Sequence, residues 1–121
     1  MSDFIVFGGI NMDLFAYVPR STQEGETIEA SSVEFYLGGK GANQAVALSR
    51  LGAEVSFVGT LGKDQFGKEL EALVSAEKID LKNLRKQDGQ SGVALINVLK
   101  DGRNEVISFP GVNKKTSSKY V

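Results

Sequence analysis

The apolar residues of this chain fall into short runs that end at glycines. Phe4 to Phe7 is continuously apolar and stops at Gly8-Gly9, and the mostly apolar run from Val55 to Val58 stops at Gly59. Runs of this length are typical of strands that are buried on both faces, as in a parallel sheet. The pattern therefore predicts two strands of a parallel sheet, with both faces of each strand covered.

Two further segments have the apolar spacing of helices. The first runs from Ala42 to Leu51 and carries mostly small apolar residues, and Gly52 stands where a helix commonly ends. The second follows Asp64, a residue type that caps helices. Its apolar residues fall at i, i+4, i+7 and i+8, which places them on one core-facing side: Phe66, Leu70, Leu73 and Val74.

A third pattern, strict alternation, predicts strands with one exposed face. Val33 to Leu37 alternates in this way. Gly92 to Leu99 and Glu105 to Phe109 read as two strands, and the Asp101-Gly102 pair between them is a strong hairpin signal. We predict that these three strands form a small β-element beside the main sheet. The polar stretch from Asn113 to Lys119, with its three lysines, is predicted to be a solvated tail.

Strands that alternate with helices imply an α/β fold with right-handed crossovers. A parallel sheet needs helices on both faces and usually has about 5–6 strands. The apolar patterns described above supply only about two central strands and two helices. We therefore expect a partial domain, whose open sheet edge is covered by further residues or by another chain.

Composition removes several classes of function. The 121 residues carry a formal net charge of −1 and contain no cysteine and no histidine. The missing residues exclude disulfides, thiolate metal sites, a Ser-His-Asp triad and the usual zinc ligands. The net charge gives no sign of a basic surface that would bind nucleic acid. No apolar run approaches the roughly 20 residues of a membrane span. The N-terminus leads directly into a strand, without a visible signal peptide, so we expect a cytoplasmic protein with no membrane partner.

The stretch from Gly38 to Gln44 is the strongest candidate for a binding site. Three glycines, one lysine and two amides stand at the start of a predicted helix, where free N–H groups and a partial positive charge favour polar or anionic ligands. The Walker A spacing fails because Glu34 stands where that motif needs glycine, and the dinucleotide fingerprint fails at Gln44. The stretch is neither a P-loop nor a Rossmann turn.

The same stretch resembles the first signature of the ribokinase-like (pfkB) carbohydrate kinases. Within that family, its sequence is most similar to the signature of the ribokinase branch. The signature continues through Ala47 and into Leu51-Gly52-Ala53. Further segments match in the family's order over essentially the whole chain: Gly8 to Asp13, Gly25 to Thr27, Gly59 to Gly67 and Ser91 to Ile96. The resemblance implies the N-terminal part of a ribokinase-like three-layer α/β/α sandwich with a small β-sheet lid.

The resemblance also implies a sugar site. Asn11 and Asp13 would bind sugar hydroxyls, and a carboxylate beside an amide suits that role because one accepts while the other both donates and accepts. The remaining implied binding residues come from the glycine-rich turn and from an apolar lid wall: Gly39, Lys40, Gly41, Asn43, Ala94, Ile96 and Phe109. Tyr36 either faces the sugar or is an exposed aromatic of an edge strand.

The family's phosphoryl-transfer residues have no counterpart in this chain. The late DTxGAGD-type motif with the catalytic aspartate is absent, and so is the Asn-x-x-Glu motif linked to magnesium. We expect lid strands at about 12–37 and 92–109, core segments at 4–10 and 41–91, no catalytic or metal-binding residue, and no activity of these residues alone. ATP, Mg²⁺ and a monovalent cation such as K⁺ are implied for the complete enzyme, with a homodimer formed through the lid.

The substrate stays open at this point. ATP-dependent phosphorylation of ribose to ribose 5-phosphate is the first hypothesis, and another sugar or a nucleoside is an alternative. A truncated sugar-binding or dimerising module without catalysis is a second hypothesis from a different class.

Overall fold

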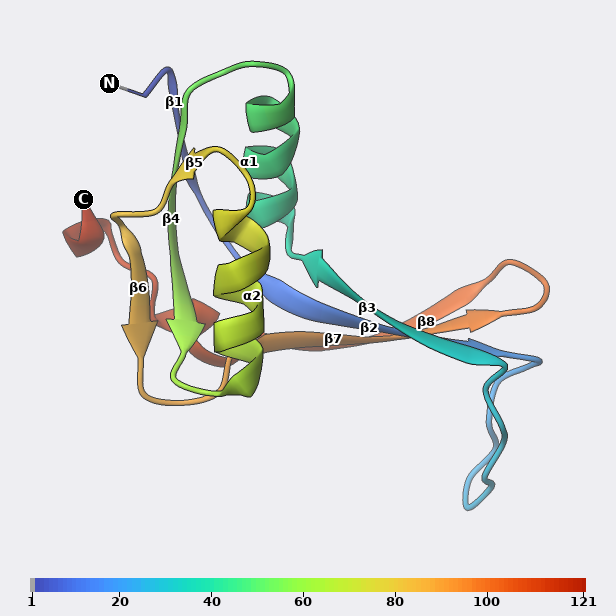
Figure 1. The fold of residues 1–121 in the computed structure, drawn as a ribbon. Helices are drawn as coiled ribbons and strands as arrows, with labels where there is room; N and C mark the ends of the chain where they lie inside the picture. Colours follow the sequence, from blue (N-terminus) through green and yellow to red (C-terminus); the bar gives the residue numbers. More distant parts are fainter. Residues whose placement is uncertain (1) are drawn as a thin grey trace.

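The computed structural model describes residues 2–121, which form two four-stranded sheets, two α-helices and two 3-10 helices (Figure 1). We call the first sheet the core sheet. It is parallel and contains four strands: β1 (Phe4–Phe7), β4 (Val55–Gly62), β5 (Ile79–Asp80) and β6 (Leu84–Gln87). Within the described residues, helices α1 (Lys40–Arg50) and α2 (Gln65–Ser75) both pack against β4.

The second sheet extends away from the core in Figure 1, and we call it the projecting sheet. Its strand order is β3-β2-β7-β8, with these bounds: β2 (Asn11–Val18), β3 (Ser32–Gly38), β7 (Gly92–Leu99) and β8 (Asn104–Phe109). The central pair, β2 and β7, is parallel, and each outer strand is antiparallel to its neighbour. The predicted association of the 33–37 strand with the 92–109 hairpin is confirmed.

The hydrophobic core lies between the core sheet and the two helices. Val6, Phe57 and Leu61 of the strands contact Leu70 and Val74 of α2 within one buried cluster. The helical spacing therefore predicted the buried face of α2 correctly for Leu70 and Val74. Leu73 was predicted to be a core residue, but 44% of its surface is exposed.

The prediction that β1 is buried on both faces is wrong. Val6 is buried, but Phe4, Ile5 and Phe7 are 49%, 62% and 53% exposed. Val6 lies in register with Phe57 and shares its helix-covered face, whereas Ile5 and Phe7 alternate to the other face. Among the described residues, β1 is also an edge strand with a neighbour on one side only, which adds to its exposure.

The C-terminal residues are not the solvated tail that their polarity predicts. They form the 3-10 helices η1 (Gly111–Lys115) and η2 (Ser118–Tyr120). Val112 is buried, and Thr116 Oγ1 lies 2.8 Å from Oγ1 of the fully buried Thr60 on β4. Lys115 donates to the Asp88 carbonyl over 2.8 Å. Lys114 and Lys119 are exposed, as expected.

No helix within residues 2–121 has the length and apolar character needed to cross a bilayer.

Candidate functional site

The candidate site lies where the projecting sheet joins the core. Asn11 opens β2 beside Gly38 at the end of β3, and Asp13 lies opposite Tyr36. A Cβ atom built on Gly38 would lie only 2.1 Å from the carboxyl carbon of Asp13. The carboxylate therefore lies directly over the Gly38 backbone, and any other residue at this position would displace it.

The glycine-rich turn brings the start of α1 against the turn between β1 and β2. Gly39 has a φ of +95°, which favours glycine, and the Ala42 N–H donates to the Gly9 carbonyl over 3.0 Å. A Cβ on Gly41 would lie 2.8 Å from the Cα of Gly8, so the two backbones are in close contact. The glycines of the motif thus hold the helix start next to the first residues of β2.

The N-terminus of α1 keeps free donors. The helix has no side-chain cap, and within the described residues the N–H groups of Lys40 and Gly41 have no hydrogen-bond partner. Free N–H groups at a helix start attract oxygen ligands. Lys40 and Asn43 are exposed, and Asn43 lines a groove with Tyr36 and Leu37 of β3.

Asp13 is a half-buried carboxylate without a partner among residues 2–121. It makes no ion pair and no hydrogen bond there, and burial raises its pKa above the ordinary value. A buried acceptor without a partner is costly to a fold. This carboxylate can accept hydrogen bonds from a ligand that carries hydroxyl groups.

The register of the projecting sheet decides which predicted wall residues share the face of Asp13. Ala94 lies directly opposite Asp13 on β7, Ile96 lies opposite Phe15, and both Ala94 and Ile96 are buried. Phe109 pairs with Val93 and therefore points to the opposite face. Phe109 was predicted to line the same wall, and within one chain that prediction is wrong.

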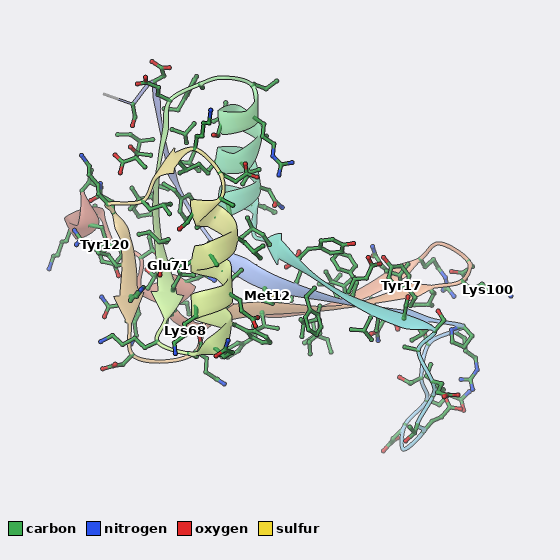
Figure 2. The ribbon with its side chains drawn as sticks, in the orientation of Figure 1. Met12, Tyr17, Lys68, Glu71, Lys100 and Tyr120 are labelled. Carbon is green, nitrogen blue, oxygen red and sulfur yellow. The ribbon has the colours of Figure 1, made fainter. Side chains whose placement is uncertain are left out.

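Tyr36 on β3 pairs with Asp13 on β2, so the two side chains lie on the same face of the projecting sheet. Its ring packs edge-to-face on Phe15 with centroids 5.5 Å apart, and its hydroxyl donates to the Glu34 carboxylate. The hydroxyl is thus already engaged. Figure 2 shows Met12 at the junction of the two sheets and Tyr17 towards the outer end of β2, so the candidate residues stand at the inner end.

Sequence reasoning missed Asn113, which it assigned to the tail. The carboxamide of Asn113 accepts from the Ile10 N–H over 2.9 Å and donates to Asn11 Oδ1 over 2.8 Å. These partners stand 103 and 102 residues away. The local sequence offers one signal, an amide residue that follows Gly111 and Val112 directly after the predicted hairpin.

The grouped side chains suit a polyol better than a metal ion or a redox group. They offer one carboxylate, one amide, free backbone N–H groups and a lysine beside two apolar side chains. Within residues 2–121, no group of three histidine, cysteine, aspartate or glutamate side chains lies close enough to hold a metal ion.

Comparison with known proteins identifies the family of this chain. Residues 1–120 match the model of the pfkB family of carbohydrate kinases. A ribokinase of Haemophilus influenzae is 38% identical over 96% of this chain, and a deoxyribokinase of Salmonella typhi is 34% identical over 93% of it. This chain covers 38% and 37% of those two proteins, so it spans well under half the length of the curated relatives it matches.

Solved structures give the same result for the fold. The ribokinase of Arabidopsis thaliana, solved in complex with ribose and ATP, superposes with a TM-score of 0.83 at 36% identity, covering 93% of this chain and 37% of that one. A ribokinase of Cryptococcus neoformans in complex with ADP has a TM-score of 0.81 at 32% identity, covering 92% and 35%. The α/β fold with a small additional sheet is the ribokinase fold.

Proposed function

Because this chain belongs to the pfkB family of carbohydrate kinases, we propose that residues 1–121 form the sugar-binding part of a sugar kinase, with ribose as the sugar. The observation that carries the proposal is the partnerless, half-buried carboxylate of Asp13 held over Gly38 beside the amide of Asn11. Ribose is supported by the ribokinases among the relatives and by the ribose complex of the Arabidopsis protein.

In this proposal each polar group has one task toward the sugar. Asp13 accepts hydrogen bonds from two neighbouring hydroxyls, and Asn11 supplies the complementary amide group. Lys40 and the free N–H groups at the start of α1 bind further oxygens. Ala94 and Ile96 cover the carbon face of the sugar ring and exclude water, which strengthens the polar contacts.

Phosphoryl transfer is proposed to depend on residues outside this stretch. ATP use is implied by the relatives, one of which was solved with ADP, and no group of three histidine, cysteine, aspartate or glutamate side chains among residues 2–121 could hold Mg²⁺. Positioning and electrostatic stabilisation provide most of phosphoryl-transfer catalysis. Residues 1–121 alone are therefore proposed to bind the sugar without consuming ATP, in the cytoplasm.

The projecting sheet is proposed to act as a lid over the sugar and as the contact between two subunits. The face opposite Asp13 carries a row of apolar residues that spans all four strands, which we call the apolar row: Phe35, Leu14, Leu95 and Ile107. Three of them are 45% to 66% exposed. Exposed apolar rows on a sheet are rare unless another surface covers them.

A second candidate is a kinase for a related sugar, which the Salmonella deoxyribokinase favours. A sugar that lacks one hydroxyl leaves a buried polar group without a partner, which costs about 1–3 kcal/mol. The preference between ribose and 2-deoxyribose is therefore the sharpest distinction between the two candidates.

The test combines sugar binding with ATP consumption for residues 1–121. Calorimetry is expected to show ribose binding that Asp13→Ala weakens about 10- to 100-fold, because a hydrogen bond to a charged group contributes about 1.5–3 kcal/mol. Asp101→Ala, at the exposed hairpin tip, is the matched control and should leave binding unchanged. No ADP should be released with ATP, Mg²⁺, K⁺ and ribose.

Two results would contradict this proposal. Ribose-dependent ADP release that Asp13→Ala reduces would mean that residues 1–121 are catalytically complete. Equal ribose binding by the wild type and Asp13→Ala would remove Asp13 from the site.

A further inference from the structure

We propose that Asn113 is a positioning residue for sugar binding, whose carboxamide holds the side chain of Asn11 with its NH₂ group free for the sugar. The inference rests on the proposed function, because Asn11 is a sugar-binding residue only within it. Asn113 itself is not proposed to touch the sugar.

The contacts of Asn113 link two parts of the chain, distant in sequence, that meet at the junction of the sheets. Its Oδ1 accepts from the Ile10 N–H over 2.9 Å. Its Nδ2 lies within hydrogen-bonding distance of three oxygens: the carbonyls of Ile10 (3.1 Å) and Pro110 (2.9 Å), and Oδ1 of Asn11 (2.8 Å). The carboxamide thus joins the start of β2 to the residues that follow β8.

These partners fix the orientation of both amides. Reversing the carboxamide of Asn113 would place its oxygen against three acceptors and its NH₂ group against an N–H donor, so only one orientation is satisfied. The Oδ1 of Asn11 is then occupied by Asn113. The Nδ2 of Asn11 is the end that remains for a ligand, and it offers only donors.

Asn11 and Asp13 therefore offer complementary hydrogen-bonding groups on the same strand. Asn11 presents N–H donors, and Asp13, two residues along the same face of β2, presents only acceptors when charged. A sugar hydroxyl can accept from the amide and donate to the carboxylate at the same time. Without Asn113, the amide of Asn11 could turn its oxygen toward the carboxylate side and lose this complementarity.

The first residue of β7 leaves room for the contact. A Cβ built on Gly92 would lie 2.2 Å from Nδ2 of Asn113 and 2.3 Å from Oδ1 of Asn11. Gly92 does not have a positive φ, so its backbone conformation does not require glycine. The space taken by the contact between the two amides explains the glycine instead.

The test is a double-mutant cycle on ribose affinity in the full natural chain, measured by calorimetry. Asn113→Ala is expected to weaken ribose binding about 5- to 30-fold in the wild-type background and less than twofold in the Asn11→Ala background. Gly92→Ala, which keeps both asparagines, should reproduce the effect of Asn113→Ala. Thr60→Val removes a different contact to the same C-terminal segment and should change affinity less than twofold.

A second readout needs no sugar. The side-chain amide resonances of Asn11 in a ¹⁵N-labelled sample should move in Asn113→Ala and Gly92→Ala and stay in place in Thr60→Val. Unchanged Asn11 resonances, unchanged ribose affinity of Asn113→Ala, or equal weakening in both backgrounds would overturn the inference alone. A wild-type chain that binds no ribose would instead overturn the proposed function, and the inference with it.

Discussion

For a single residue, Asp13, the proposed role in binding has a cost in stability. Burial raises the pKa of its carboxyl group, so the folded state binds the proton more readily than the unfolded state does. Between the ordinary value of 3.8 and the raised value, stability therefore falls as the pH rises. Above this window the charged carboxylate costs the fold free energy, as expected for a group held in place for a ligand.

This cost predicts an unusual phenotype for Asp13→Asn. At pH 7 the variant should unfold at an equal or higher urea concentration than the wild type, while its ribose affinity falls about 10-fold or more. Asp101→Asn is the matched control, because hydrogen bonds from Arg103 lower the pKa of Asp101, and ribose affinity should not change. A loss of more than about 1 kcal/mol of unfolding free energy in Asp13→Asn would show a structural carboxylate instead.

At the scale of elements, Asp64 ties the first turn of α2 to the start of β7. Its carboxylate accepts from the Gly67 N–H over 2.8 Å, from the Ser91 N–H over 2.9 Å and from the Ser91 hydroxyl over 2.7 Å. Burial opposes the charged form, but the hydrogen bonds from Ser91 and Gly67 outweigh it and lower the pKa. Asp64 thus stabilises the fold above its ordinary pKa, and that contribution disappears as the pH falls through the lowered value.

Asp64→Ala is expected to lower the unfolding free energy at pH 7 by about 2–4 kcal/mol, because a helix cap and two further hydrogen bonds to a charged group are lost. Urea denaturation at pH 7 and pH 3 measures the effect, and the difference in unfolding free energy between Asp64→Ala and the wild type should be smaller at pH 3. The unfolding free energy of Asp64→Asn, which keeps one acceptor, should lie between those of the wild type and Asp64→Ala. A loss of equal size at both pH values would contradict the assigned role of the charge.

Elements governed by local pattern were predictable from sequence, and elements governed by distant partners were not. The small apolar face of α1, the cap of α2 and the Asp101-Gly102 hairpin all follow from residues within a few positions. The strands β5 and β6 were missed, because β6 is largely polar and exists through its pairing with β4.

The residues of the candidate site also differ in how far local sequence predicts them. Asn11, Asp13 and the glycine-rich turn were found from a signature that is contiguous in sequence. The position of Phe109 depends on the register between β7 and β8, which alternation alone does not fix, and a slip of one residue reverses the face. Asn113 was missed because all its decisive partners except Pro110 lie about one hundred residues away.

At the scale of the whole molecule, two apolar surfaces are open. Phe4, Ile5 and Phe7 of β1 are exposed, and so is most of the apolar row of the projecting sheet. If the apolar row joins two subunits, Ile107→Lys should convert residues 1–121 from dimer to monomer in sedimentation velocity. Ile5→Lys is the matched control, since Ile5 is 62% exposed against 66% for Ile107, and it should leave the dimer intact. Dissociation by Ile5→Lys alone would place the contact on β1.

The proposed sugar site lies at the junction of the two sheets. The most direct measurement is a titration of ribose into ¹⁵N-labelled residues 1–121, followed by amide chemical shifts. We predict saturable shifts that gather at residues 11–13, 38–43 and 94–96, and that Asp13→Asn moves to ribose concentrations about 10-fold higher or more. Shifts gathered at the outer end of the projecting sheet, around Tyr17 and Lys100, or no saturable shift at all, would contradict it.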